Sequence, residues 1–91
     1  MKRLEATVKG HVQGVSFRAS TRSRAQALGL TGWVRNEYDG SVQVIAEGPE
    51  ERLRQFLQFL NQGPFPAHVT QVDVIWAAAT GEFTYFSVRY Q

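Results

Sequence analysis

The chain has 91 residues, of which 43% are hydrophobic and 12% aromatic, so it is long enough for one compact domain, which we expect to span residues 1–91. It contains no cysteine, which excludes disulfides, thiolate zinc sites and cysteine nucleophiles. Its formal net charge is only +2 and its basic residues are scattered, a pattern that does not favour nucleic-acid binding. No apolar stretch approaches the roughly 20 residues that cross a bilayer, and the first residues lack the apolar core of a secretory signal. We therefore expect a cytoplasmic protein with no membrane partner.

The first half of the chain predicts a strand, a helix and a hairpin. Apolar and polar residues alternate over residues 4–10, which is the period of a half-buried strand. Apolar residues then recur at helical spacing over residues 17–28, and a glycine follows as the expected stop. Residues 31–36 and 42–46 have the pattern of two further strands. Asp39-Gly40 between them supplies the positive φ angle that a tight turn requires.

The second half predicts one more helix and two more strands. Residues 48–51 are Gly-Pro-Glu-Glu, a favourable helix start, and an apolar stripe at helical spacing follows as far as Leu60. Residues 63–66, Gly-Pro-Phe-Pro, end that helix. Apolar and polar residues alternate over residues 72–76, which predicts a strand. A turn follows at residues 78–81, and the same alternation over residues 84–90 predicts the last strand.

The predicted order is β-α-β-β-α-β with an additional C-terminal strand. This order predicts an α+β ferredoxin-like sandwich, with a mostly antiparallel sheet of four to five strands and two helices on one face. We expect four aromatic residues in the core, namely Trp33, Phe56, Trp76 and Phe86. His11 and His68 have no evident partner in the sequence, and we assign them no role.

The segment Gly10-His11-Val12-Gln13-Gly14-Val15-Ser16-Phe17-Arg18 lies between the first strand and the first helix. Unpaired N–H groups at a helix start, together with the helix dipole, form an anion site, and Gly14 allows the backbone to approach a ligand closely. The guanidinium of Arg18 can bind two phosphate oxygens at once. The segment lacks the Gly-Lys-Ser/Thr of a P-loop and the three glycines of a dinucleotide-binding loop. Its spacing from His11 to Arg18 matches the loop of cysteine phosphatases, but Val12 occupies the cysteine position.

Without that nucleophile, phosphoryl chemistry at this segment requires water as the attacker, because Ser16 and Ser20 have no paired base in the sequence. Asn36 is our candidate for orienting the water, since its amide both donates and accepts hydrogen bonds without adding negative charge. The sequence offers no cluster of Asp, Glu and His for Mg²⁺ or Zn²⁺, so the leaving group must depart without metal assistance. A carboxylate satisfies this requirement. We therefore expect no metal.

At this point the sequence resembles the acylphosphatase family. The resemblance rests on the segment 10–18, on Gly32-Trp33-Val34-Arg35-Asn36, and on the shorter matches Gly40-Ser41-Val42 and Gly48-Pro49. It extends to the terminal Phe86-Ser87-Val88-Arg89-Tyr90, so that it covers essentially the whole chain. It implies a ferredoxin-like fold, hydrolysis of the carboxyl-phosphate bond of acyl phosphates to a carboxylate and inorganic phosphate, and no cofactor.

The resemblance also implies roles for particular residues. The loop that binds the phosphoryl group comprises Gln13, Gly14, Val15, Ser16, Phe17 and Arg18. Arg18 is the substrate-binding arginine, and Asn36 is the asparagine that holds the attacking water. Position 37 is Glu, where some family members carry a small hydroxyl residue, so we expect its carboxylate to repel substrate slightly.

Three other functions compete with this interpretation. A module of the same fold could bind anions or regulate without turnover. A small RNA-recognition domain shares the element order, but its aromatic-rich sequence motif is absent. Acylphosphatase-like domains also form the first domain of larger carbamoyl-transfer maturation factors, but we expect no further domain on this chain. We expect a monomer whose partner is a small-molecule acyl phosphate, with no nucleic-acid partner.

Overall fold

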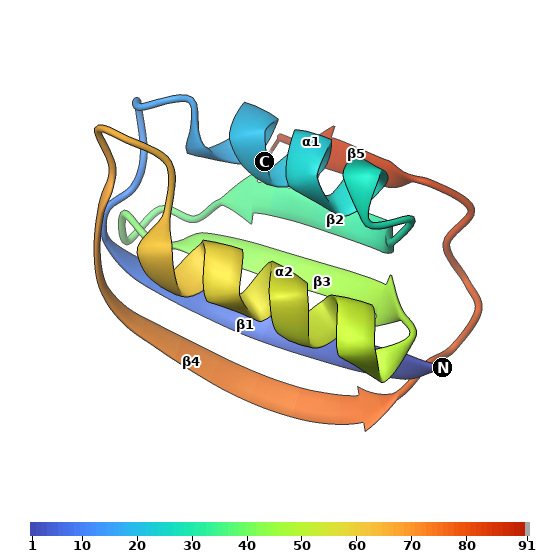
Figure 1. The fold of residues 1–91 in the computed structure, drawn as a ribbon. Coiled ribbons are helices and arrows are strands. Elements are labelled where there is room, and N and C mark those ends of the chain that lie inside the picture. Colours follow the sequence, from blue (N-terminus) through green and yellow to red (C-terminus); the bar gives the residue numbers. More distant parts are fainter. Residues whose placement is uncertain (91) are drawn as a thin grey trace.

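The computed structural model describes residues 1–90 and contains one five-stranded sheet with two helices (Figure 1). In chain order the elements are β1 Lys2–His11, α1 Phe17–Ala27, β2 Thr31–Asn36, β3 Val42–Gly48, α2 Glu50–Gln62, β4 His68–Ala78 and β5 Phe86–Arg89. The order of strands across the sheet is β4-β1-β3-β2-β5. Only β5 runs parallel to its neighbour, β2, and the other pairs are antiparallel. The predicted α+β sandwich is confirmed.

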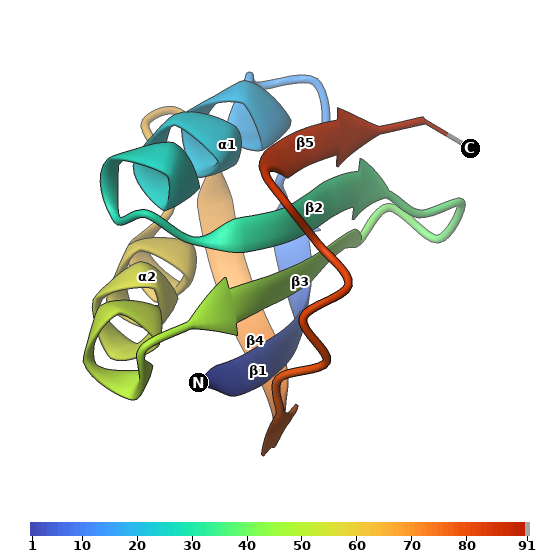
Figure 2. The ribbon, with the colours of Figure 1, turned by 90° about the vertical axis from the view of Figure 1, so that its right-hand side faces the viewer.

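Both helices cover the same face of the sheet, and the core lies between them and the strands (Figure 2). Along β1 the alternating apolar side chains Leu4, Ala6 and Val8 are fully buried toward the helices. The rings of Phe56 in α2 and Phe86 in β5 pack edge to face at 5.9 Å between centroids. Each such buried side chain contributes about 1.5–3 kcal/mol relative to exposure, which holds α2 against both the centre and the edge of the sheet.

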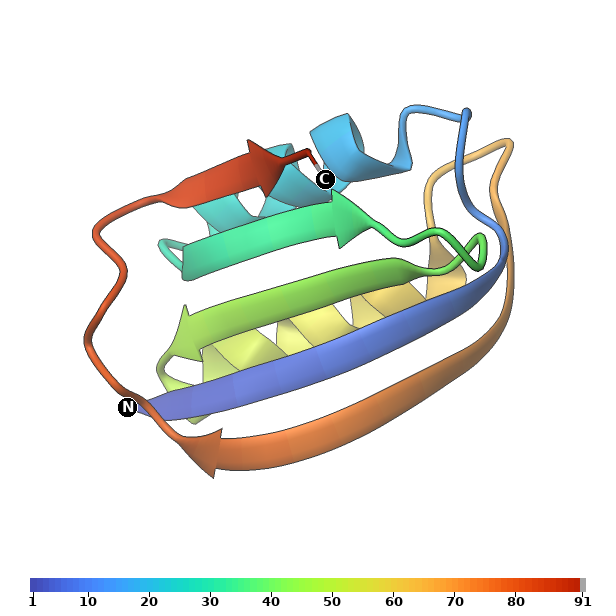
Figure 3. The ribbon, with the colours of Figure 1, turned by 180° about the vertical axis from the view of Figure 1, so that it is seen from behind.

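The other face of the sheet carries no helix (Figure 3). Here the prediction for Trp33 is wrong. Trp33 is only half buried, and the guanidinium carbons of Arg35 and Arg89 lie over its ring, at 4.7 and 5.0 Å from the centroid. The neighbouring Val34 is the residue of β2 that points into the core. Trp76 does face the core, but it lies at its margin and is only partly buried.

The predicted turn at residues 78–81 and the predicted strand at residues 84–90 are both wrong in extent. β4 continues to Ala78, and β5 is confined to Phe86–Arg89. Residues 79–85 form a connection that crosses one end of the sheet from the β4 edge to the β5 edge (Figure 2). A crossing is needed because the two strands occupy opposite edges, and a two-residue turn cannot span the strands between them.

Glu47 of β3 fastens this connection. Its carboxylate is 5% exposed and accepts hydrogen bonds from the Thr80 N–H, the Thr80 hydroxyl and the Gly81 N–H at 2.9–3.0 Å. It also accepts a hydrogen bond from the Arg3 guanidinium at 3.1 Å. Burial opposes ionisation of Glu47, but these hydrogen bonds outweigh it and hold the pKa of its carboxyl below the ordinary value.

Three chain segments meet at one end of the sandwich: the loop after β1, the start of α1 and the end of β2 (Figure 1). β5 runs in the same direction as β2 and therefore brings Tyr90, the last described residue, to the same place. Within residues 1–90, no helix has both the length and the apolar character needed to cross a membrane.

Candidate active site

The loop between β1 and α1 is bent by two residues with positive φ angles. Gly14 has φ 77°, and Ser16, directly before α1, has φ 62° and ψ 23°. An added Cβ atom at Gly14 would meet nothing within 4 Å, so the backbone angle rather than lack of space favours glycine there. At Ser16 the left-handed conformation costs about 1 kcal/mol. Left-handed and right-handed residues in succession turn their N–H groups toward a common point, an arrangement that binds anions.

The N–H groups of this loop are free to bind a ligand. Within the described residues 1–90, the amides of residues 14–19 have no hydrogen-bond acceptor, and the next amide, that of Ser20, donates to the Ser16 carbonyl at 3.1 Å. α1 contains no acidic residue, whereas α2 has Glu50 and Glu51 in its first turn. The positive end of the α2 dipole is therefore offset by carboxylates, and that of α1 is left for an external anion.

Two apolar side chains anchor the loop in the core. Phe17 is 1% exposed, and its ring packs against that of Phe59 in α2 at 6.5 Å between centroids. Val15 packs against the same core. The side chains of these two residues therefore hold the loop backbone in position beside the site.

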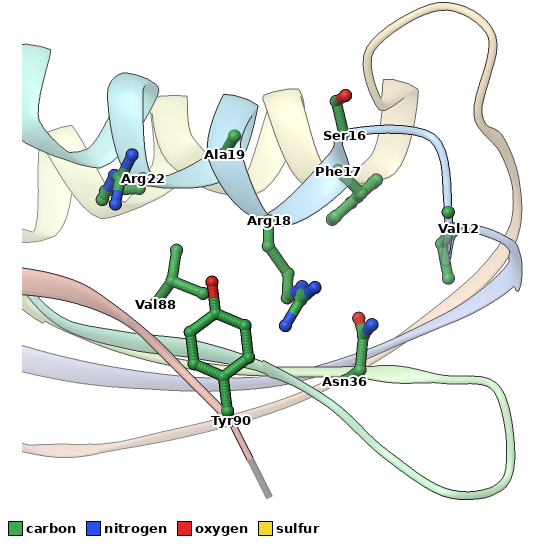
Figure 4. A pocket seen from close by; sticks show the side chains of 10 residues that line it. Val12, Ser16, Phe17, Arg18, Ala19, Arg22, Asn36, Val88 and Tyr90 are labelled. Atoms are coloured by element: carbon green, nitrogen blue, oxygen red, sulfur yellow. The ribbon is translucent and has the colours of Figure 1, made fainter.

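Arg18 extends from the first turn of α1 toward the end of β2 (Figure 4). It is half buried, and its guanidinium carbon lies 4.8 Å from the centroid of the Tyr90 ring. Among the described residues it forms no ion pair with a carboxylate. The charge of Arg18 is thus held in place by an aromatic ring and remains available for an anion.

Asn36, the last residue of β2, points toward the guanidinium of Arg18 (Figure 4). Its Oδ1 atom is buried and has no hydrogen-bond donor among the residues that the structure describes. A buried polar atom without a partner costs about 1–3 kcal/mol, so its persistence points to a function. The atom can accept a hydrogen bond from a small polar molecule in the cavity that this residue lines.

A cavity of about 360 Å³ lies between these groups. It is lined by the loop and the first turns of α1, by Asn36, and by Val88 and Tyr90 at the end of the chain. Among residues 1–90, no acidic residue lines it. The structure therefore brings Arg18 and Asn36, which are 18 positions apart in the sequence, to one cavity beside the unpaired amides.

The Gln13 side chain, in contrast, serves the hairpin between β2 and β3. Its Nε2 atom donates to the Glu37 carbonyl at 2.7 Å and to the Ser41 carbonyl at 2.9 Å. The Gln13 side chain is thus occupied, and only the backbone of this residue remains for a ligand. That Gln13 binds substrate through its backbone stays a prediction. Ser16 also lines the cavity, but its hydroxyl points away from Arg18 and Asn36 (Figure 4).

The Glu37 carboxylate pairs with Arg35, with contacts of 2.7 and 3.4 Å. The positive charge of Arg35 offsets that of the carboxylate, so the repulsion of substrate predicted for position 37 should be small.

Among the lining residues that were not singled out from the sequence, Arg22 and Tyr90 carry polar side chains. Arg22 follows Arg18 by four positions, a spacing that places both on one face of a helix. Tyr90 follows Val88 by two, which places both on one face of a strand. These spacings were visible in the sequence, but they acquire meaning only once the elements are known to border the same cavity.

Comparisons with known proteins agree with this geometry. The profile of the acylphosphatase family matches residues 4–88. The acylphosphatase of Salinibacter ruber is 50% identical over 88 residues, covering 97% of this chain and 93% of that protein, and the acylphosphatase of Nocardia farcinica is 53% identical over 87 residues, covering 96% and 87%. The crystal structure of acylphosphatase from Bacillus subtilis superimposes with a TM-score of 0.95 at 36% identity, covering 99% of this chain and 100% of that one.

Proposed function

The chain belongs to the acylphosphatase family and is an enzyme that hydrolyses acyl phosphates, and from this premise we propose that Arg18 binds the phosphoryl group while Asn36 holds the attacking water. The observation that carries this division of roles is the placement of an unpaired guanidinium and an unpaired buried amide oxygen at one cavity, beside the free amides of the loop.

Phosphoryl binding falls to the loop and to Arg18. The N–H groups of residues 14–19 and the guanidinium surround the phosphoryl oxygens and neutralise the charge that spreads over them in the transition state. These groups are fixed before substrate arrives, because Phe17 anchors the loop in the core and the Tyr90 ring supports Arg18. Little reorganisation is then needed during reaction.

Asn36 orients the attacking water. A water that donates a hydrogen bond to Oδ1 is oriented with a lone pair toward phosphorus. Its oxygen forms the new P–O bond while the bond from phosphorus to the carboxylate oxygen breaks. The products are a carboxylate, inorganic phosphate and a proton released to solvent. The carboxylate leaves as a stable anion, so we propose that no general acid, metal or cofactor takes part.

The test is hydrolysis of benzoyl phosphate in excess EDTA and in water enriched in ¹⁸O. We expect phosphate release to continue under chelation and the label to enter phosphate rather than benzoate. Turnover that vanished with EDTA, or label in benzoate, would refute the proposed route. The alternative, an anion-binding or regulatory module without turnover, predicts binding of inorganic phosphate with no release above the spontaneous rate.

We further propose that the enzyme acts as a monomeric single domain in the cytoplasm, with a small-molecule acyl phosphate as its partner and without nucleic acid. The anion site is a cavity of about 360 Å³, a size suited to small molecules. Size-exclusion chromatography with light scattering tests the monomer, and fractionation of the source cells tests the compartment.

A further inference from the structure

Arg22 is a second cation at the cavity, and the proposed division of roles leaves it unused. It lies one helical turn beyond Arg18 and lines the cavity from the same helix. Figure 4 shows it on the opposite side of Arg18 from Asn36, with Val88 and Tyr90 along the region between. The cavity thus has a polar end at Asn36, a cationic end at Arg22, and the side chains of Val88 and Tyr90 between them.

The positive charge of Arg22 is not paired with a carboxylate within residues 1–90. Arg3, Arg35 and Arg54 each form ion pairs with glutamates. Arg22 is exposed and, within residues 1–90, its guanidinium has no ion pair, hydrogen bond or ring contact. The described part of the chain contributes no acidic residue to the cavity lining, so a ligand that enters is the natural partner for this guanidinium.

The direction of the reaction places the acyl group near Arg22. In an in-line displacement the leaving group departs on the side opposite the attacking water. Since the water is held at Asn36 in the proposed function, the acyl group extends away from Asn36, which is the side on which Arg22 lies. This step rests on the proposed roles of Arg18 and Asn36.

We propose that Arg22 binds a second anionic group carried on the acyl chain of the substrate. The preferred substrates are then acyl phosphates with a distal carboxylate or phosphate, either of which a guanidinium binds through paired N–H donors. Val88 and the Tyr90 ring contact the carbon chain between the two anionic groups. Arg18 holds the phosphoryl group that reacts, and Arg22 selects the acyl group that leaves.

The test compares three substrates that share one leaving-group framework: benzoyl phosphate, 4-carboxybenzoyl phosphate and 4-phosphonobenzoyl phosphate. In Arg22→Gln we expect KM to rise about fivefold more for the two charged substrates than for benzoyl phosphate. The two charged substrates distinguish a carboxylate from a phosphate-like group. The matched control is Arg24→Gln, which removes the same charge from the same helix at a residue that contacts Phe59 and does not line this cavity. It should leave the ratio of KM values unchanged.

A binding measurement separates this inference from the proposed function. We expect 4-carboxybenzylphosphonate to bind the wild-type protein about fivefold more tightly than benzylphosphonate, and the difference to disappear in Arg22→Gln. Equal effects of Arg22→Gln on all ligands, or the same change in Arg24→Gln, would show that Arg22 contributes only to the general positive potential and would overturn the inference. Failure of the proposed function instead appears with benzoyl phosphate alone, as hydrolysis by the wild-type protein that stops in excess EDTA or that places the ¹⁸O label in benzoate.

Discussion

The guanidinium carbon of Arg18 lies 4.8 Å from the centroid of the Tyr90 ring. Tyr90, the last described residue, and the first turn of α1 therefore meet at the cavity. A cation over an aromatic face is attracted by the ring's quadrupole, and the contact limits the rotamers open to the long arginine side chain. Tyr90 is therefore a positioning residue for Arg18.

Replacing this ring should weaken phosphoryl binding. In Tyr90→Ala we expect KM for benzoyl phosphate to rise about two- to fivefold, since an exposed cation–π contact is worth about 0.5–1 kcal/mol. Tyr90→Phe keeps the ring and should restore most of the affinity, which steady-state kinetics of the two variants would measure. A loss of the same size in Tyr90→Phe would assign the effect to the hydroxyl group instead.

Arg18 and Asn36 should fail in different ways when each is replaced by alanine. Arg18→Ala removes a group that touches the bound anion, so we expect turnover to fall about 100-fold or more and phosphate to bind weakly. Asn36→Ala removes only the group that orients water, so turnover should fall while the inhibition constant of inorganic phosphate stays within about twofold of the wild type. Equal losses of phosphate affinity in both variants would contradict the separate roles.

Gln13 should stabilise the fold as well as the site, because its side chain joins the loop to the mouth of the hairpin next to Asn36. Gln13→Ala removes two hydrogen bonds between the loop and the hairpin, although each carbonyl keeps a backbone donor, and should lower the free energy of unfolding by about 1–2 kcal/mol. For a domain of this size that corresponds to a fall in Tm of roughly 5–10 °C, measurable by circular dichroism. Gln71→Ala, which removes an exposed contact with Asp73 at the β4 edge, is the matched control and should change Tm little.

The acid stability of the protein should depend on Glu47. Its pKa is lower in the folded chain than the ordinary value of 4.5, so its stabilising contribution is present above pH 4.5 and is lost as the pH falls through the folded pKa. Glu47→Gln should therefore destabilise the protein by about 2 kcal/mol near pH 7 and by less near pH 3. Urea denaturation of both proteins at the two pH values measures this difference. A loss that did not depend on pH would mean that the charge of Glu47 is not what holds residues 79–85.

Much of the fold could be predicted because its signals are local. The strand at residues 31–36 has the predicted limits, and Gly40 adopts the positive φ expected for the hairpin. Glu50 and Arg54, four positions apart on α2, form an ion pair at 2.8 Å. Each of these features is fixed by neighbours in the sequence. The β5 strand and the crossing before it depend instead on contacts with β2 and Glu47, which no local pattern records.

The error at Trp33 was avoidable. Successive side chains of a strand point to opposite faces, so Trp33 and Asn36, three positions apart, cannot both face the helices. The prediction that Asn36 orients water at the anion site beside the start of α1 already required Trp33 to lie on the open face. Three other contacts could not be predicted: Arg22 with the cavity, the Tyr90 ring with Arg18, and the Gln13 side chain with the hairpin. Each depends on which elements meet at one end of the sheet.

The parallel pairing of β5 with β2 determines where an affinity tag should be attached to this protein. An affinity tag joined after the last strand would start within reach of Arg18 and could obstruct the entrance for ligands. β1 carries its first residue the length of ten strand positions, on the order of 30 Å, from the loop that follows it. Purification handles and surface linkers therefore belong at the amino end, where they leave the entrance open.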